Sequence, residues 1–398
     1  MLSQTKSKNV FSDNILITVL IILVGTGLSM LLSSSYFHGD KIFGDSLYFF
    51  RRQVLWVVIG VLAGFFAANI KLDFLRWIVP LLVLLSFILM ILTFVPGVGV
   101  EIMGARRWII VGGMSFEPSE LVKFSLILYL AHILDRKGNL SELSFSQNLR
   151  AILPPLIIVS VFTGLVYLQN DFSTAFFLVL LSMSMMWFSG VRLSFFISLV
   201  SVGIPLSVLL LLTKEHRVLR LIAFLEPNAD PVGSGYQVLS AKTALARGGL
   251  WGQGIGQGKI KLGSLPEAHS DFVFAVLGEE MGLLGVVLII GLFLVFAWRG
   301  YRIVYWHPEQ FGKYLSFGIT TSIIFQAFLN IAVVSGLLPT TGLPLPLFSQ
   351  GGSSMLITLM MCGLLVGLSK KKVIEATNTG TDFRHQFDSA VLEEGDRE

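Results

Sequence analysis

Long apolar runs separated by short polar segments make up most of the chain. A helix needs about 20 mainly apolar residues to cross roughly 30 Å of hydrocarbon, and about ten stretches meet this requirement. We expect these spans at 15–32, 54–70, 77–95, 120–134, 152–168, 173–188, 193–212, 272–298, 315–338 and 353–368. The pattern therefore predicts an all-α polytopic integral membrane protein. The first run is too long for a signal peptide and no small-residue cleavage site follows it, so we expect it to be retained.

The distribution of Lys and Arg predicts the orientation. With the N-terminus inside, the cytoplasmic segments hold Lys6, Lys8, Lys71, Arg136, Lys137, Arg150, Arg192, Arg299, Arg302, Lys313, Lys370, Lys371 and Lys372. The opposite short loops hold fewer, chiefly Lys41, Arg51, Arg52, Arg106 and Arg107. The positive-inside rule then places both termini in the cytoplasm, which an even number of spans requires.

Composition excludes several other classes of protein. Hydrophobic residues make up 54% of the 398 positions and charged residues only 14%, against roughly 25% charged in soluble domains. The net charge of +4 comes with no Lys/Arg stripe interleaved with aromatics, so we expect no nucleic-acid partner. A single cysteine, Cys362, excludes a disulfide framework or a thiolate metal site within the chain.

We expect one transmembrane domain over residues 1–369, followed by a cytoplasmic, disordered tail at 370–398. A large extracytoplasmic loop at 213–270 interrupts the domain between the seventh and eighth spans. Loops of that length are usually functional or disordered, and the aromatic and apolar content here favours a functional loop. It contains a helix-compatible segment at 236–246 and a glycine-rich run at 248–258.

Two opposite charges lie where the fourth span begins. Pro118 and Ser119 are typical of a helix start, and Glu120 and Lys123 lie three residues apart on one face, where they can pair. The pair either neutralises itself as part of the helix start or lines a polar cavity between helices. We favour the cavity, because an aliphatic pair would fill the position at lower cost.

Asp171 lies in the very short connection between the fifth and sixth spans. It can cap the following helix, and a capping carboxylate that faces a cavity could also pair with Lys123. The two roles are compatible.

Glycines alternate from Gly252 to Gly258. Exposed backbone N–H groups in such a run can cradle a phosphate. However, no predicted strand precedes the run and no βαβ unit surrounds it, which excludes a dinucleotide-binding fold. A tight turn that lets the backbone approach neighbouring helices is at least as good an interpretation.

Carboxylates mark the entry to the eighth span. Asp271 lies where the hydrophilic loop meets the span, Glu279 follows two turns or about 12 Å further along the same face, and Glu280 points the other way. We expect Glu279 to have a structural role, buried and paired with a cation such as Lys123. Asp271 either caps the helix or handles protons beside an anionic substrate, and its place at the mouth of a basic loop favours the second role.

Three motifs occur in order along the chain and carry a family resemblance. They are Gly-Ala-Arg-Arg-Trp (104–108) with Pro-Ser-Glu-Leu-Val-Lys (118–123), then Leu-Pro-Glu-Ala-His-Ser-Asp-Phe-Val-Phe (265–274) with Gly-Glu-Glu (278–280), then Gly-Leu-Leu-Pro-Thr-Thr-Gly-Leu-Pro-Leu-Pro (336–346) with Ser-Gln-Gly-Gly-Ser-Ser (349–354). From the first to the last helix they resemble the SEDS proteins (shape, elongation, division and sporulation), the FtsW and RodA type peptidoglycan glycosyltransferases. The second motif is more similar to the division type, FtsW, than to RodA.

The resemblance implies polymerisation of lipid II into glycan strands at the outer face of the bacterial cytoplasmic membrane. The 4-hydroxyl of an acceptor sugar would attack the anomeric carbon of a donor, and undecaprenyl pyrophosphate would leave. The catalytic aspartate of the family falls on Asp271, as general base. The resemblance also implies a class B penicillin-binding protein as transpeptidase partner, and other divisome or elongasome membrane proteins.

The resemblance also suggests substrate-binding residues. A pyrophosphate leaving group develops negative charge that basic side chains of the loop can stabilise, with a divalent cation, Mg²⁺ or Mn²⁺, left open as a helper. The candidates are Arg217, Arg220, Lys242 and Arg247 from the loop, Trp108 and Lys123 at positions important in the family, and Glu120, Asp171, Glu267 and His269 nearby. Gly351 and Gly352 are expected to be structural.

The chain departs from the family pattern at three positions. Ser270 stands where threonine is more common, Glu117 where glutamine precedes Pro-Ser-Glu, and Gln350 where tyrosine precedes the glycines. Serine keeps a hydroxyl, whereas Gln350 could alter local packing.

Two other functions compete with the enzyme. The main alternative is a flippase for a lipid-linked precursor, and an inert scaffold for other wall enzymes is a third. A flippase needs polar groups through the whole depth of the membrane, whereas charge here concentrates in the outer half and the outer loop, which favours the enzyme.

Overall fold

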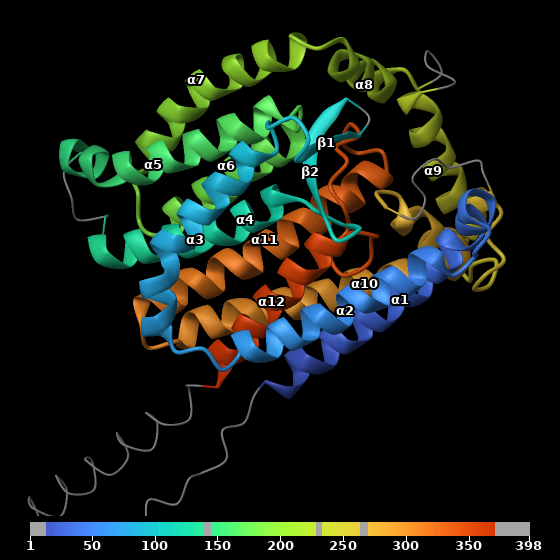
Figure 1. Ribbon diagram of the computed structural model, residues 1–398, viewed down its shortest axis with the longest axis horizontal. Helices are drawn as coiled ribbons and strands as arrows, with labels where there is room; N and C mark the ends of the chain where they lie inside the picture. The colour runs from blue at the N-terminus through green and yellow to red at the C-terminus, as the bar shows by residue number, and fades with distance from the viewer. Residues whose placement is uncertain are drawn as a thin grey trace, which may run out of the picture.

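The computed structural model describes residues 13–102, 104–138, 140, 145–227, 233–262 and 270–370. This part of the chain forms twelve α-helices and a small antiparallel sheet (Figure 1). Eight of the helices are long and apolar enough to cross a membrane. The predicted fold class, a polytopic helical membrane protein, is therefore confirmed.

The helices that correspond to the predicted spans are α1 (Asn14–Phe43), α2 (Tyr48–Ala67), α3 (Leu72–Leu92), α4 (Pro118–Lys137), α5 (Phe145–Leu168), α6 (Phe172–Phe188), α7 (Leu193–Leu212), α10 (Val273–Trp306), α11 (Gln310–Val334) and α12 (Gly352–Ser369). The predicted loop holds α8 (Glu215–Leu225), α9 (Ser234–Gly248) and a 3-10 turn (Ile260–Leu262). The helix expected at 236–246 is thus found as α9, whereas α8 was not expected. Apart from Lys370, the predicted tail at 370–398 lies outside the described residues.

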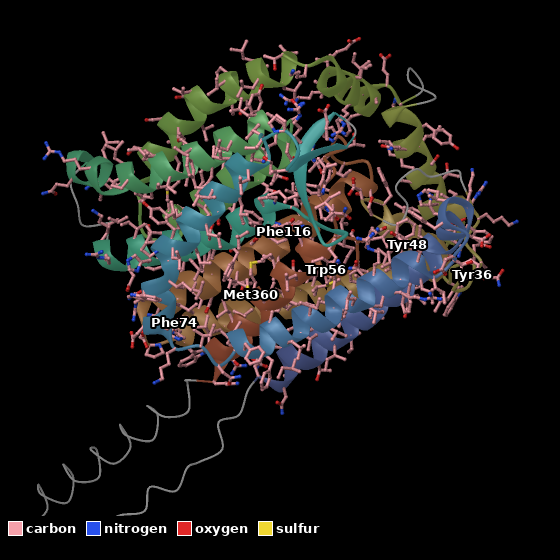
Figure 2. All side chains as sticks on the ribbon, in the orientation of Figure 1. Tyr36, Tyr48, Trp56, Phe74, Phe116 and Met360 are labelled. Carbon is pink, nitrogen blue, oxygen red and sulfur yellow. The ribbon has the colours of Figure 1, made fainter. Side chains whose placement is uncertain are left out.

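Both ends of the described chain meet at one end of the helix bundle, where the backbone N–H of Asp13 donates to Ser369 Oγ at 3.3 Å. We call this the terminal end. The opposite end, which carries the sheet, α8 and α9, is the loop end (Figure 1). Figure 2 shows Phe74 toward the terminal end, and Tyr36 and Tyr48 at the far tip of the α1–α2 hairpin.

Helices α4 and α11 form the centre of the bundle. They pack against each other. Helix α4 also contacts α3 and α6, and α11 also contacts α6, α10 and α12. Glu120 and Lys123 of α4 are 6% and 2% exposed, so neighbouring helices and not lipid surround this charged helix. A span hidden from lipid can be polar where its groups are paired, which explains why α4 lacks the hydropathy of the outer spans.

A three-stranded sheet covers part of the loop end, and the expectation of an all-helical chain missed it. Strands β1 (Gly99–Ile102), β2 (Ala105–Val111) and β3 (Met114–Phe116) are antiparallel in the order β1-β2-β3. Gly112 and Gly113 have φ angles of 57° and 78° and make the β2–β3 turn, a conformation that favours glycine. Strands this short leave little periodic signal in a sequence.

Helix α10 breaks at Gly282, whose φ is 66° and ψ is −167°. The glycine-rich run fills the break: the N–H groups of Gln253 and Gly254 donate to the carbonyls of Glu279 and Glu280, and Leu283 N–H donates to Gly249 O. Broken backbone near a bilayer must find its partners within the protein. The tight-turn interpretation of the run is therefore confirmed.

The Glu279 and Glu280 carboxylates bind the glycine-rich run and the 3-10 turn that comes after it. Glu279 accepts from the N–H groups of Lys259 and Ile260, at 3.1 and 3.2 Å. Glu280 accepts from Gly256 N–H at 3.0 Å and pairs with Lys261 at 2.6 Å. Glu279 is 1% exposed, as expected. The expected ion pair with Lys123 is wrong, because backbone N–H groups donate to the Glu279 carboxylate instead.

The predicted structural glycines lie where α12 begins against α2. A Cβ on Gly352 would lie 2.2 Å from Trp56 Nε1, whereas a Cβ on Gly351 would meet only Ser354 Cβ, at 3.5 Å. Gly351 is in extended backbone at φ 172°, which any residue can adopt. Only Gly352 therefore requires the absence of a side chain.

We expect Gly352→Ala to destabilise the protein by about 1–3 kcal/mol, because the indole of Trp56 has to move out of a packed interface. Gly351→Ala is the matched control and should unfold like the wild type. Thermal unfolding of both variants in detergent measures the difference. Equal melting temperatures for the two would contradict the steric argument.

Candidate active site

A cavity of about 320 Å³ opens at the loop end among α6, α7, α8, α11 and the segment that joins α11 to α12. Its polar lining consists of Arg107, Asn170, Asp171, Ser173, Ser207, Arg217, Arg220, Thr340 and Thr341. Its apolar lining consists of Phe172, Phe176, Val208, Leu211, Leu221, Leu329, Leu338, Pro339 and Leu343. An amphiphile with an anionic head and an apolar chain fits such a divided surface.

Arg107 joins the sheet to the α5–α6 connection. Its guanidinium pairs with Asp171 at 3.2 Å and donates to the carbonyl of Asn170 at 3.0 Å. Asn170, at φ 64°, donates back to Gly104 O at 2.9 Å. Asp171 also caps α6 by accepting from Thr174 N–H, so the capping prediction is confirmed. The expected partner Lys123 is wrong, because Arg107 takes that place.

Arg217 extends from α8 into the bundle and is 6% exposed. It donates to Leu210 O at 2.9 Å and stacks over the rings of Tyr167 and Phe172, with 4.7 and 5.4 Å to the ring centroids. Its Nε and Nη2 atoms, and Nε of Arg107, are buried and find no hydrogen-bond partner among the described residues. Buried donors are rarely left unpaired, so these groups can serve an anionic ligand.

Arg220 completes the basic side of the cavity. Burial lowers the pKa of its guanidinium, and the nearby charge of Arg107 lowers it further, while Asp271 and Asp171 act in the opposite direction. A guanidinium keeps its proton nevertheless. Arg107, Asp171, Arg217 and Arg220 line the same cavity, so these charges share one local environment.

Asp271 lies two residues before the first residue of α10. Asn330 of α11 donates to the Asp271 carbonyl and to Leu343 O, each at 2.8 Å. A Cβ added to Gly342 would lie 3.5 Å from Asp271 Oδ2. The half-buried Asp271 is therefore held against the 342–343 turn, which borders the cavity through Leu343.

A second buried group supports the same turn from below. Lys123 Nζ donates to Glu120 at 2.8 Å and to Gln326 Oε1 at 2.7 Å, and Gln326 in turn donates to Pro344 O at 2.9 Å. Glu120 and Lys123 do pair, as expected. They do not line the cavity; they connect α4 to the turn beside Asp271.

Three of the remaining predicted residues, Trp108, Lys242 and Arg247, do not line the cavity. Trp108 lies on β2 under the guanidinium of Arg107, at 5.9 Å from the ring centroid. Lys242 and Arg247 are exposed on α9, and Lys242 lies over the Gly336 turn. Glu267 and His269 lie outside the described residues. Lys242 and Arg247 thus do not join Arg217 and Arg220.

Three residues beside or supporting the cavity were not singled out from the sequence. Arg107 belongs to the first motif, but only its neighbour Trp108 was predicted to bind substrate. Gln326 and Asn330 lie four residues apart within an apolar span, and polar side chains at membrane depth are a signal that could have found them.

The described residues contain no group of three or more His, Cys, Asp or Glu side chains that could hold a metal ion. Among the described residues, Asp171 lines the cavity together with three arginines, and the charges of Asp171 and Asp271 both act on Arg220. This donor set does not fit a resident divalent cation, so we assign no chemical step to one.

Comparison with known proteins gives the family. A family model described as a cell cycle protein, of the FtsW, RodA and SpoVE type, matches residues 13–373. The chain is 38% identical over 358 residues to a protein of Trichlorobacter lovleyi named probable peptidoglycan glycosyltransferase FtsW, covering 90% of this chain and 93% of the relative. It is 37% identical over 366 residues to stage V sporulation protein E of Bacillus subtilis, covering 92% and 98%.

Solved structures share the fold. A chain from work on polymerization and crosslinking by a peptidoglycan synthase complex matches with a TM-score of 0.75 at 26% identity, over 91% of this chain and 99% of the other. The rod shape determining protein RodA of Thermus thermophilus matches with a TM-score of 0.66 at 25% identity, over 91% and 98%. Sequence, motifs and fold agree, and the chain belongs to the SEDS family of FtsW, RodA and SpoVE.

Proposed function

We propose that this protein is a peptidoglycan glycosyltransferase that polymerises lipid II at the outer face of the cytoplasmic membrane. The observation that carries the proposal is the cavity, where arginine donors without partners among the described residues lie next to Asp271 and above an apolar wall. Relatives named as glycosyltransferases, aligned over most of their length, support the same reaction.

The substrate would lie across both surfaces of the cavity. A diphosphate suits Arg107, Arg217 and Arg220, because guanidinium groups bind phosphate oxygens with paired N–H donors. The polyprenyl chain suits the apolar side formed by residues such as Phe176, Val208 and Leu329. Charge that develops on the leaving diphosphate would meet donors already in position.

Asp271 would act as general base on the acceptor. The acceptor 4-oxygen forms a bond to the donor anomeric carbon, and its proton passes to the Asp271 carboxylate. The bond from that carbon to the diphosphate oxygen breaks, and the electron pair leaves with undecaprenyl pyrophosphate. Asn330 donates a hydrogen bond to the Asp271 carbonyl and so fixes the backbone position from which the carboxylate extends.

The proposal includes the topology and the partner. We place the terminal end in the cytoplasm from the Lys and Arg distribution and the loop end outside, with residues 1–369 as one domain. A class B penicillin-binding protein is the proposed partner, since a structurally similar chain belongs to a peptidoglycan synthase complex.

A flippase is the less supported alternative. Below Lys123, α4 presents Leu126, Ile127, Leu128 and Leu130 at 0% exposure in the centre of the bundle. Residues 124–131 of α4 therefore offer a polar head group no charged partner.

Asp271→Asn should lower polymerisation of lipid II by about 10²–10⁴-fold, because the amide cannot accept the proton. The hydrogen bond from Asn330 uses the main chain, so the turn should remain in place. Asp45→Asn, at the exposed Asp45–Arg51 pair of the same end, is the matched control. Activity of Asp271→Asn within twofold of the control would remove Asp271 as the base.

Arg107→Lys should raise the KM for lipid II by about 10–100-fold, since a lysine cannot hold Asp171, Asn170 and a phosphate together. The neighbour Arg106 is half-exposed and pairs with Glu101 on the surface, so Arg106→Lys is the matched control. Steady-state kinetics of both variants measure the difference. An unchanged KM in Arg107→Lys would separate this arginine from the substrate.

Glu117, which replaces the usual glutamine, lies just before α4 and accepts from Ser119 Oγ at 2.9 Å. Burial, together with the charges of Glu120 and Asp171, raises the pKa of Glu117 from 4.5 to about 7, against the effect of Arg107. At pH values between 4.5 and about 7, Glu117 is thus mostly protonated in the folded protein and mostly ionised in the unfolded chain. Its contribution to stability therefore falls as the pH rises from 4.5 through about 7.

Glu117→Gln should remove this dependence. We expect the variant to melt a few degrees above the wild type at pH 8 and close to it at pH 5. Thermal unfolding across this pH range measures the effect, with Glu101→Gln on the exposed Glu101–Arg106 pair as the control. A constant difference between Glu117→Gln and wild type at all pH values would contradict the titration.

A further inference from the structure

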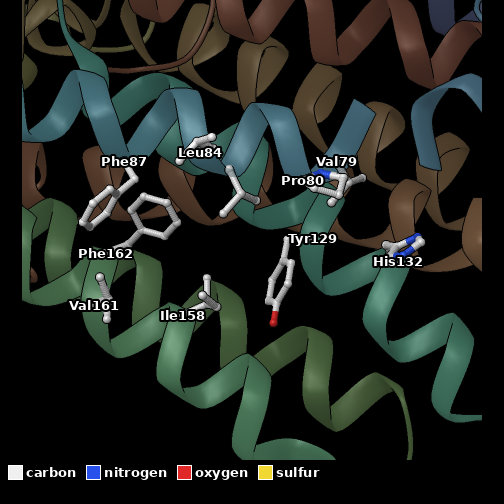
Figure 3. A pocket seen from close by; sticks show the side chains of 10 residues that line it. Val79, Pro80, Leu84, Phe87, Tyr129, His132, Ile158, Val161 and Phe162 are labelled. Carbon is white, nitrogen blue, oxygen red and sulfur yellow. The ribbon is translucent and has the colours of Figure 1, made fainter. Parts of the chain in front are cut away.

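A second cavity, of about 400 Å³, lies between α3, α4 and α5 (Figure 3). Its walls are Val79, Pro80, Val83, Leu84 and Phe87 of α3, Tyr129 and His132 of α4, and Ile158, Val161 and Phe162 of α5. His132 lies twelve residues beyond Glu120 on α4, about 18 Å closer to the terminal end. The cavity is therefore separate from the candidate active site.

Two polar groups interrupt this apolar surface. Figure 3 shows the Tyr129 hydroxyl directed away from α3 toward α5, and it makes no hydrogen bond with the described residues. His132 Nδ1 is buried and also lacks a partner among them. A cavity that held only hydrocarbon would leave the buried His132 Nδ1 without a partner and would place the Tyr129 hydroxyl against hydrocarbon, and both carry a cost in free energy.

A cationic side chain, Arg136, lies on the same face of α4 as Tyr129 and His132. Tyr129, His132 and Arg136 are spaced at i, i+3 and i+7, so they form one stripe that leads from the cavity to the terminal end. Arg136 is exposed and makes no ion pair with the described residues. The neighbouring Arg76, in contrast, is neutralised by Asp73, Asp135 and Glu309.

The stripe matches the order of groups in a membrane lipid. Arg136 is next to the last residue of α4, where a phosphate would lie, and His132 is one turn deeper, about 6 Å into the membrane. Ester carbonyls lie below the phosphate and acyl chains below the esters. Tyr129 and the apolar walls come next in that order.

We propose that this cavity is a binding site for an anionic glycerophospholipid from the leaflet at the terminal end. The phosphate pairs with Arg136, and an ester carbonyl accepts from His132 Nδ1 in the tautomer that carries its proton there. One acyl chain lies along the apolar walls, which include Phe87 and Phe162. The site does not depend on the proposed glycosyl transfer.

Other lipids fit less well. A zwitterionic head group brings its own cation, which competes with Arg136 for the phosphate. A polyprenyl phosphate has the negative charge but no ester carbonyl, so His132 and Tyr129 would remain unpaired. Both serve as comparison ligands.

The test is native mass spectrometry of the full-length protein in detergent, titrated with phosphatidylglycerol, phosphatidylcholine or undecaprenyl phosphate. We expect phosphatidylglycerol to bind most tightly, and Arg136→Gln and His132→Phe each to weaken it about tenfold, a loss of about 1.4 kcal/mol. Lys137→Gln removes the same charge one residue away on a different face of α4, and should bind like the wild type. Thermal unfolding of each variant confirms that it is folded.

Equal binding by Arg136→Gln and Lys137→Gln would overturn the proposal, because the charge would then act without a defined site. Tighter binding of undecaprenyl phosphate than of phosphatidylglycerol would also overturn it and assign the cavity to a polyprenyl lipid. Should His132→Phe fail to fold, Tyr129→Phe replaces it, with a smaller loss of about threefold expected for one neutral hydrogen bond.

Discussion

The candidate active site depends on two buried amides of α11. Gln326 links Lys123 to the carbonyl of Pro344, and one turn further Asn330 links the carbonyls of Leu343 and Asp271. Amides suit this position because each offers both donors and an acceptor. Through these two side chains, α11 binds the charged pair of α4, the turn before α12 and the segment that begins α10. The site is therefore assembled from segments far apart in the sequence.

Burial within the membrane domain explains why the buried carboxylates of Glu279 and Glu280 each have several hydrogen-bond or ion-pair partners. Glu279 takes two backbone donors, and Glu280 takes Gly256, Lys261 and Ser33. An unpaired charge at this depth would cost several kcal/mol. The break at Gly282 obeys the same rule, since the glycine-rich run supplies the partners that the interrupted helix lacks. Glycines are needed where backbones meet this closely: a Cβ on Gly252 would lie 2.2 Å from Glu280 O.

Much of the fold could be predicted from hydropathy, because lipid contact imposes apolar composition on each outer span. The choice of Asp271 rests on a carboxylate at a loop–helix boundary. Partners could not be predicted in the same way: Glu279 and Lys123 are both buried charges, but spacing along one chain carries no information on which helices are neighbours. Arg107 was missed for the same reason, since its role depends on contact with Asn170 and Asp171, more than sixty residues away. The sheet was missed because three short strands lack a clear period.

In the proposed reaction, the charges around the cavity affect the rate of turnover as well as substrate binding. Arg107, Arg217 and Arg220 oppose Asp171 and Asp271, so three positive groups and two negative ones leave a single net positive charge. A diphosphate outweighs that charge, and binding alone would therefore not be very tight. A group that gains negative charge as the glycosidic bond forms benefits more from the same donors than the bound substrate does, and it is this difference that lowers a barrier. A fully unpaired set of arginines would hold the leaving diphosphate more tightly and would slow its release. The Arg107–Asp171 pair thus lowers the net positive charge of the site and keeps the Arg107 donors in place.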